Sequence, residues 1–323
     1  MSQRMDARSW ELSRVRLSRE FLILVEMAVV SGVPSTFNGL YDVLTYPIAK
    51  WLGRRAGGFE DFEVISLLER QGGCSRVYYA FDRLSGSFVV LKVVPLLQKG
   101  VEARFNEEKS IALQLSSSPY IVKTIQSFTE SYQGVLVSQH MTTDLYERFI
   151  GRPLPQKKLA FLFYQICNGV LACHRHGISH LDIKPENILL DEHDNPKLCD
   201  FGSAHRIGPE TVFDPSFRPG SDFYKAPEIL IPKTRIGPAA DMWSLGILLF
   251  VLACGILPFA GLTERLMLNN YRQSRLHLSP LNESDLSSRG KNLLTRLLQI
   301  RPKDRPKITS VLRDPWFLEM RMV

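Results

Sequence analysis

The chain has 323 residues, of which 45% are apolar and 23% charged, and this composition is ordinary for a soluble globular protein. A chain of this length can form two lobes or domains with a sizeable core. The formal net charge of +7 favours acidic ligands such as nucleotides, but lysine and arginine are scattered without a polybasic run or zinc-finger pattern, so we expect no nucleic-acid binding.

The first part of the chain bears on its cellular compartment. Residues 1–58 show no catalytic pattern and form an N-terminal extension of unknown role, in which arginines precede an apolar stretch at 21–33, as in a signal peptide. Glu26 interrupts that stretch, and its roughly 13 residues are fewer than the ~20 that a membrane-spanning helix needs. We expect an apolar helix packed on the body, with membrane association through residues 21–33 or a poorly ordered extension as alternatives. The five cysteines lack a CxxC pair, which favours an intracellular location in the cytoplasm, the nucleus or both.

From Phe62 the sequence changes to short runs rich in β-branched and aromatic residues, separated by glycine or polar turns. This pattern predicts an antiparallel meander of strands at 62–68, 76–82 and 87–94, and two further strands at 121–128 and 134–141. Between these groups, Phe105, Ile111 and Leu115 have the spacing of one helix face over 101–115. From Lys157 onward helices dominate, and the near-continuously apolar stretches 159–177 and 241–255 are typical of buried core helices.

These elements predict an α+β fold with two lobes. The smaller, antiparallel β-rich lobe with one helix would span about residues 62–140. The larger, mainly helical lobe would span about residues 141–317, and residues 318–323 would form a short tail.

Four motifs follow one another along this body: VVLK ending at Lys92, HLDIKPEN at 180–187, DFG at 200–202 and KAPE ending at Glu228. Phosphoryl transfer needs a cover over the phosphates, a cation on them, carboxylates and an amide for Mg²⁺, and a residue that orients the attacking hydroxyl. Residues about 62–317 supply these parts in order and resemble a eukaryotic protein kinase of serine/threonine type. GILPFAG and NILLDEHDNPKLCDFG are most similar to the calmodulin-dependent, AMP-activated and checkpoint kinase group.

The resemblance implies ATP and Mg²⁺ as cofactors and gives the motif residues roles. Asp182 would orient the substrate hydroxyl and accept its proton, and Lys184 would reach the γ-phosphate. Asn187 and Asp200 would ligate Mg²⁺. Lys92 would hold the α- and β-phosphates.

The ion-pair partner of Lys92 is expected on the helix at 101–115. Glu108 is the better candidate, because Ile111 and Leu115 follow it at the family's spacing, and Glu107 is the alternative. Two scaffold contacts are also implied: Glu228 would pair with Arg305, and Asp241 would anchor the backbone of the catalytic loop.

The glycine-rich loop departs from the family pattern. In RQGGCSRV at 70–77, Arg70 replaces the first glycine, Gly72 keeps the second and Ser75 replaces the third. We expect weaker or differently shaped ATP binding, not its loss. The nucleotide would still be contacted by Gly72, Gly73, Cys74, Ser75 and Val77. Ser138 falls at the gatekeeper position before the hinge, where a small side chain implies an open cavity behind the adenine site.

Leu181 is the second departure, because most family members carry arginine there to pair with a phosphorylated activation-loop residue. We expect a kinase that does not depend on this phosphate switch. A pseudokinase scaffold, or a replacement contact elsewhere, are the alternatives. Active members of the calmodulin-dependent group also carry leucine or phenylalanine at this position.

Two residues favour serine and threonine as the phosphorylated side chains of protein substrates. Lys184 is the residue that serine/threonine kinases carry two positions after the aspartate, and Ser221 stands where the family has a threonine. Glu186 and Asp144 lie where the related group reads basic residues upstream of the phosphorylation site, although they could equally be solvated surface acids.

Overall fold

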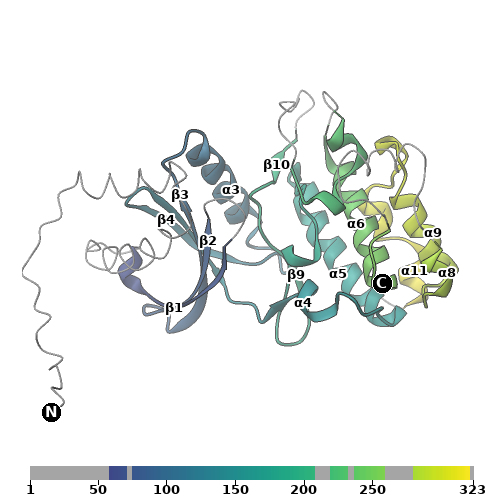
Figure 1. Ribbon diagram of the computed structural model, residues 1–323, viewed down its shortest axis with the longest axis horizontal. Helices are drawn as coiled ribbons and strands as arrows, with labels where there is room; N and C mark the ends of the chain where they lie inside the picture. Colours follow the sequence, from purple (N-terminus) through teal and green to yellow (C-terminus); the bar gives the residue numbers. More distant parts are fainter. Residues whose placement is uncertain (1–57, 71–74, 208–218, 232–235, 259–278, 321–323) are drawn as a thin grey trace, which may run out of the picture.

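The protein folds into two lobes (Figure 1), as the sequence predicts. The computed structural model describes residues 58–70, 75–207, 219–231, 236–258 and 279–320. Most of the N-terminal extension, including the apolar stretch 21–33, lies outside these ranges. In the described part of the chain, no helix is long and apolar enough to cross a membrane.

The N-terminal lobe is built on an antiparallel sheet with the strand order β1-β2-β3-β5-β4. Its strands are β1 (Phe62–Arg70), β2 (Arg76–Asp82), β3 (Ser87–Pro95), β4 (Thr124–Glu130) and β5 (Gln133–Gln139). Apolar residues alternate along β3, so Leu91 and Val93 enter a buried cluster on one face. Lys92 therefore points to the opposite face, and its neighbours across the sheet are Val77 and Leu136.

Helix α3 (Val101–Leu115) packs on this sheet and reaches toward the other lobe. Its buried Ile111 and Leu115 belong to the same apolar cluster as the core of the C-terminal lobe. Phe105 lies so close to β5 that a Cβ on Gly134 would be 2.5 Å from its ring, so only glycine allows this approach. The helix thus contacts both lobes.

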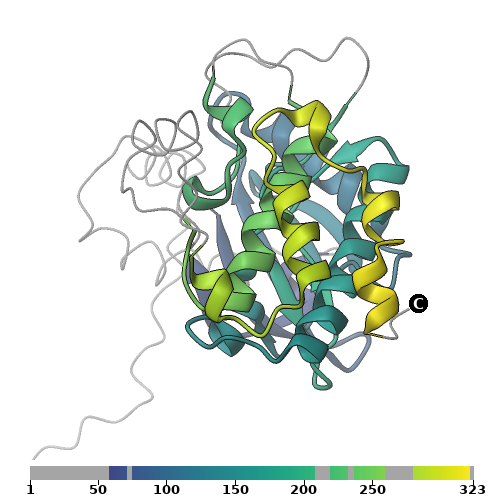
Figure 2. The same cartoon turned by 90° about the vertical axis from the view of Figure 1, so that its right-hand side faces the viewer.

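The C-terminal lobe is mainly helical (Figures 1 and 2). Its α-helices are α4 (Leu145–Phe149), α5 (Gln156–Arg175), α6 (Pro238–Cys254), α8 (Pro280–Glu283), α9 (Ser288–Leu297), α10 (Ile308–Val311) and α11 (Pro315–Glu319). Nearly every residue of α6 is buried, from Ala240 to Ala253, as its continuous apolar sequence predicts. This helix is the centre of the lobe.

Short strands and 3₁₀ turns complete the structure. β6 (Thr143–Asp144), β8 (Ile188–Leu190) and β9 (Pro196–Leu198) form one small sheet, and β7 (Ile178–Ser179) pairs with β10 (His205–Arg206). The 3₁₀ turns are η2 (Phe59–Asp61), η3 (Pro185–Asn187), η4 (Asp222–Tyr224), η5 (Pro227–Leu230) and η6 (Pro302–Asp304).

Several element boundaries differ from prediction by a few residues, and two of these differences have a clear physical cause. The strand expected at 121–128 begins at Thr124, because Ile121 forms a bridge with Leu198 and the Val122 N–H donates to the Leu198 carbonyl instead. The last helix continues to Glu319, beyond residue 318 where the tail was expected to start, because it buries Trp316 and Phe317.

Candidate active site

Lys92 lies between two carboxylates in the region where the lobes meet. Its Nζ is 2.7 Å from Glu108 Oε1 and 2.8 Å from Asp200 Oδ1. The side chains of Lys92, Glu108 and Asp200 are only 15%, 9% and 21% exposed. Of the two candidate partners on α3, Glu108 therefore makes the ion pair, and it does so from the buried face of the helix.

The charges of this cluster follow from its geometry. Burial by itself would lower the pKa of Lys92, but the carboxylates of Asp200 and Glu108 outweigh it and raise the pKa. Burial opposes ionisation of Asp200 too, yet the Lys92 ammonium and the Gly202 N–H hold the pKa of Asp200 down at about 2. Burial raises the pKa of Glu108, and Lys92 only partly offsets this. At neutral pH Lys92 is charged and Asp200 is ionised.

Asp182 is the centre of a second cluster. Asn187 Nδ2 donates to Asp182 Oδ2 at 2.9 Å and to the Asp182 carbonyl at 2.8 Å. The N–H and hydroxyl of Ser221 both donate to Asp182 Oδ1, at 2.7 and 2.9 Å. Lys184 Nζ lies 3.6 Å from Oδ2. The carboxylate is thus fixed by neighbours from two separate segments.

The backbone before Asp182 is held by a buried acid on α6. Asp241 accepts the Leu181 N–H at 2.8 Å and the His180 N–H at 3.0 Å, and it also contacts His174 Nε2 at 2.8 Å. Leu181 takes a left-handed conformation with φ +63°, which leucine rarely adopts. The two backbone hydrogen bonds that Asp241 accepts hold this strained backbone in place. The anchoring role expected of Asp241 is confirmed.

His180 connects the segment of Asp182 with that of Asp200. Its Nε2 lies 3.0 Å from the Cys199 carbonyl, and its ring is 5.2 Å from that of Phe201. Phe201 itself is buried with the core of the C-terminal lobe. His180 therefore connects the Asp182 cluster with the segment that carries Asp200 of the Lys92 cluster.

The protein kinase domain family matches residues 70–317 of this chain. The chain belongs to the protein kinase family.

Relatives of this kinase domain include two fungal proteins named carbon catabolite-derepressing protein kinase. The Saccharomyces cerevisiae protein is 30% identical over 261 residues, which are 80% of this chain and 40% of the relative. The Candida glabrata protein is 30% identical over 269 residues, 82% of this chain and 42% of the relative. The SNF1-related protein kinase catalytic subunit alpha KIN12 of Arabidopsis thaliana is 30% identical over 288 residues, 87% of this chain and 53% of the relative. The chain thus spans about two fifths to one half of the length of these relatives.

A buried ion pair holds the segment after Ser221 to the end of the kinase domain. Arg305 Nη1 and Nη2 donate to the two oxygens of Glu228 at 2.7 and 2.8 Å, so the expected pairing is confirmed. Arg305 also donates to backbone carbonyls, including that of Ala239 at the start of α6. This satisfies the buried guanidinium and fixes the segment beside Asp182 to the core.

Only some of the predicted nucleotide-binding residues lie within the part of the chain that the structure describes. Gly72, Gly73 and Cys74 lie outside the described residues. Ser75 and Val77 are half-buried, and Val77 is the direct neighbour of Lys92 across the sheet. Ser138 is half-buried on β5, opposite Val90 of β3.

Sequence reasoning missed a contact between the lobes. Arg206 Nη2 on β10 donates to Gln114 Oε1 at 2.6 Å and to Ser110 Oγ at 3.3 Å. These two acceptors lie one turn apart on α3, the helix that carries Glu108. The only signal in the sequence was the spacing of Ser110 and Gln114, which places them on one helix face.

Asp144 has a structural role that sequence reasoning missed. Its carboxylate accepts the Glu147 N–H at 2.8 Å and so caps the N-terminus of α4. An aspartate three residues before such an N–H is the usual sign of a helix cap. Glu186, the other acid expected to contact substrate, is exposed.

Proposed function

We propose that this kinase chain transfers the γ-phosphate of Mg-ATP to serine and threonine hydroxyls of proteins. The observation that carries the proposal is the simultaneous assembly of two clusters, Lys92 with Glu108 and Asp200, and Asp182 with Asn187 and Ser221. Membership of the protein kinase family supports the use of ATP and Mg²⁺ in general.

The side chains present fit these cofactors. Mg²⁺ prefers oxygen ligands, and the ionised Asp200 together with the amide oxygen of Asn187 would supply them. The amide nitrogen of Asn187 donates to Asp182, so the amide oxygen of Asn187 is the atom that would bind Mg²⁺. Lys92, held charged by its carboxylate neighbours, would bind the phosphates. Bound Mg-ATP supplies the transferable phosphoryl group and a divalent charge that stabilises it.

Asp182 would accept the proton of the attacking hydroxyl. The hydrogen bonds from Asn187 and Ser221 fix its orientation, so no side-chain rotation is needed when substrate arrives. Lys184 lies beside the same carboxylate and would stabilise charge on the transferred group. Lys184 and Ser221 next to Asp182 support the preference for serine and threonine.

Regulation would differ from that of most family members at Leu181. Its side chain is 3% exposed and packs in the core of the C-terminal lobe. It offers no cation for a phosphate on the activation segment. We propose that activity does not depend on such a phosphate. Phosphatase-treated protein should keep its rate of peptide phosphorylation, and a loss of about tenfold or more would contradict this.

Substrates would be proteins with basic residues upstream of the phosphorylation site. The exposed Glu186 supports this preference, whereas Asp144 already uses one oxygen as a helix cap. Each cysteine in the described part of the chain is a free thiol, which supports an intracellular location in the cytoplasm, the nucleus or both.

The test is phosphate transfer from Mg-ATP to an arrayed library of serine and threonine peptides, by the full chain and by Asp182→Asn. We expect incorporation by the unchanged chain alone, with a preference for basic residues upstream. Equal incorporation by both proteins would contradict the enzymatic function. The scaffold alternative has no support in the structure, because Lys92, Asp182, Asn187 and Asp200 are all in place.

A further inference from the structure

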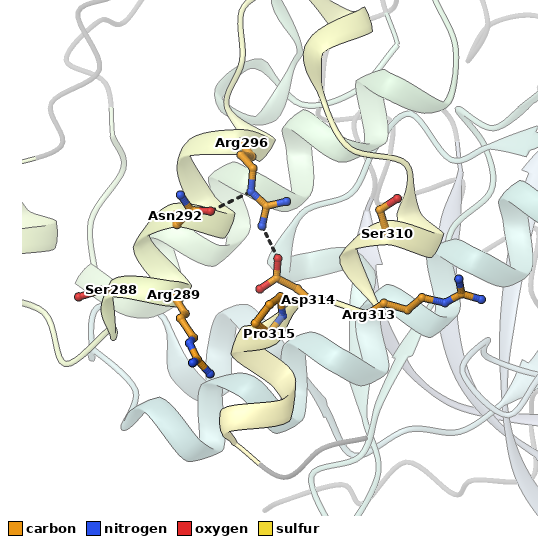
Figure 3. Close-up of a pocket in the computed structure, with 8 residues that line it drawn as sticks. All are labelled: Ser288, Arg289, Asn292, Arg296, Ser310, Arg313, Asp314 and Pro315. Carbon is orange, nitrogen blue, oxygen red and sulfur yellow. Dashed lines mark hydrogen bonds and ion pairs between the residues drawn. The ribbon is translucent and has the colours of Figure 1, made fainter.

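An open pocket of about 470 Å³ lies between helix α9 and the turn that joins α10 to α11. These helices form the end of the C-terminal lobe that faces away from the sheet (Figure 1). Its lining includes Arg289, Asn292, Arg296, Ser310, Arg313 and Pro315 (Figure 3). None of these residues belongs to the active site, so an occupant would leave Lys92 and Asp182 free.

The pocket carries positive charge that its own acid does not cancel. Asp314 is the single acidic residue among its lining residues, and it is 3% exposed. One of its oxygens pairs with Arg296, and the other accepts the Trp316 N–H at 2.9 Å. Asp314 therefore neutralises Arg296, and its single negative charge leaves the charges of the other two arginines uncompensated within the pocket.

Arg289 and Arg313 remain available to a ligand. Arg289 Nε is 3.9 Å from Glu319 Oε2, and the two side chains are 59% and 34% exposed, so this pair is weak. Arg313 is exposed and forms no ion pair with an acidic residue in the part of the chain that the structure describes. Each guanidinium offers several N–H donors in a planar fork that matches a carboxylate.

The arrangement of the arginines indicates the shape of the ligand. Figure 3 shows Arg289 and Arg313 on the two sides of Asp314 and Pro315, with the Arg289 side chain pointing down and the Arg313 side chain pointing to the right, so that their guanidiniums do not converge on one point. One small anion would not be held by both. An extended chain with acidic side chains at intervals would reach both.

We propose that this pocket docks an extended segment of a protein partner that is rich in aspartate and glutamate. Charge complementarity selects acidic side chains, and the separation of the guanidiniums selects an extended chain. The pocket is shallow and open, as docking of an extended segment requires, and Asn292 and Ser310 add polar groups to its lining. Binding is independent of catalysis; the use of the pocket to recruit substrates rests on the proposed function.

The binding test uses a fluorescein-labelled peptide of 12 residues in which glutamate and serine alternate. Its affinity for the full chain is measured by fluorescence anisotropy. We expect Arg289→Glu/Arg313→Glu to weaken binding by about tenfold or more. The matched control is Arg152→Glu/Arg175→Glu, which reverses two exposed arginines elsewhere on the same lobe and changes the net charge equally. The control should lose less than about twofold.

Three outcomes would overturn the proposal. They are the absence of saturable peptide binding, an equal loss in both double variants, and binding of a 12-nucleotide single-stranded DNA at the pocket that is tighter than that of the peptide. Arg289→Gln/Arg313→Gln removes the charges without adding repulsion and should give an intermediate loss. Thermal melts check that every variant is folded.

A kinase assay separates docking from catalysis. Phosphorylation of a short peptide should be equal in the pocket variant and the unchanged chain. For the same peptide with an appended acidic segment, the pocket variant should show a raised KM at unchanged kcat. A fall in kcat for both peptides would contradict a docking role. If the unchanged chain transfers no phosphate, the proposed function fails while the anisotropy result still decides the pocket.

Discussion

Replacing Lys92 by methionine should destabilise the protein in a pH-dependent manner. Lys92 is the shared cation of Glu108 and Asp200, at 2.7 and 2.8 Å, in a site where the three side chains are at most 21% exposed. Breaking a buried pair by removing one partner costs about 3–5 kcal/mol. We expect about 3 kcal/mol at pH 7.5, because the site is not fully closed to water.

The pH dependence follows from Glu108. Burial already raises its pKa, and the variant loses the charge of Lys92 that opposes this shift. A carboxyl whose pKa is raised in the folded state stabilises that state most below its unfolded pKa, and this stability is lost as the pH rises toward the folded pKa. The loss is about 1.4 kcal/mol for each pH unit in between. We therefore expect Lys92→Met to be less destabilising at pH 5.5 than at pH 7.5, by up to about 2.8 kcal/mol over these two pH units.

Thermal melts of the full chain and of Lys92→Met at pH 5.5 and 7.5 would measure this. A difference of about 2 kcal/mol corresponds to about 4–8 °C in Tm for a domain of this size. In Lys92→Met/Glu108→Gln the amide cannot ionise, so the double variant should be more stable than the single one at pH 7.5 and should show a smaller pH dependence. Asp200, which also loses the charge of Lys92, is the carboxylate of the cluster that still titrates. A single variant whose Tm deficit is the same at both pH values would refute this reasoning.

Three further predictions concern other parts of the kinase domain. Gly220→Ala should lower stability by about 2 kcal/mol and reduce kcat by about tenfold or more. The reason is that Gly220 has φ +90° and a Cβ there would lie 2.4 Å from the Leu181 carbonyl oxygen, next to Asp182; an unchanged Tm and kcat would contradict this. Glu228→Gln leaves the buried guanidinium of Arg305 without its counter-charge and should lower the free energy of unfolding by about 3 kcal/mol. Urea titration would measure this, and a loss below about 1 kcal/mol would show that the ion pair contributes little to stability. Ser138→Phe should reduce the affinity of bulky adenine-site inhibitors by about tenfold at a similar KM for ATP, and unchanged inhibitor affinity would exclude the open cavity.

Much of the active site could be predicted because its residues lie in short motifs whose spacing is local. The choice of Glu108 over Glu107 also followed from a local property, the helix face that Ile111 and Leu115 define. The left-handed backbone of Leu181 could not be predicted, because it is imposed by Asp241, which is distant in sequence. The predicted start of β4 was wrong for the same reason, because Ile121 pairs with Leu198, which is distant in sequence.

The contact of Arg206 with α3 has a consequence for how the two lobes respond to salt. Dissolved ions weaken attraction between exposed charges, as for Arg83 and Glu63 in the N-terminal lobe. Arg206 instead donates to a neutral amide and a neutral hydroxyl. Such contacts are hardly screened. The helix that carries Glu108 should therefore keep its position over the C-terminal lobe from low to high ionic strength, while exposed ion pairs such as Arg83–Glu63 lose their contribution.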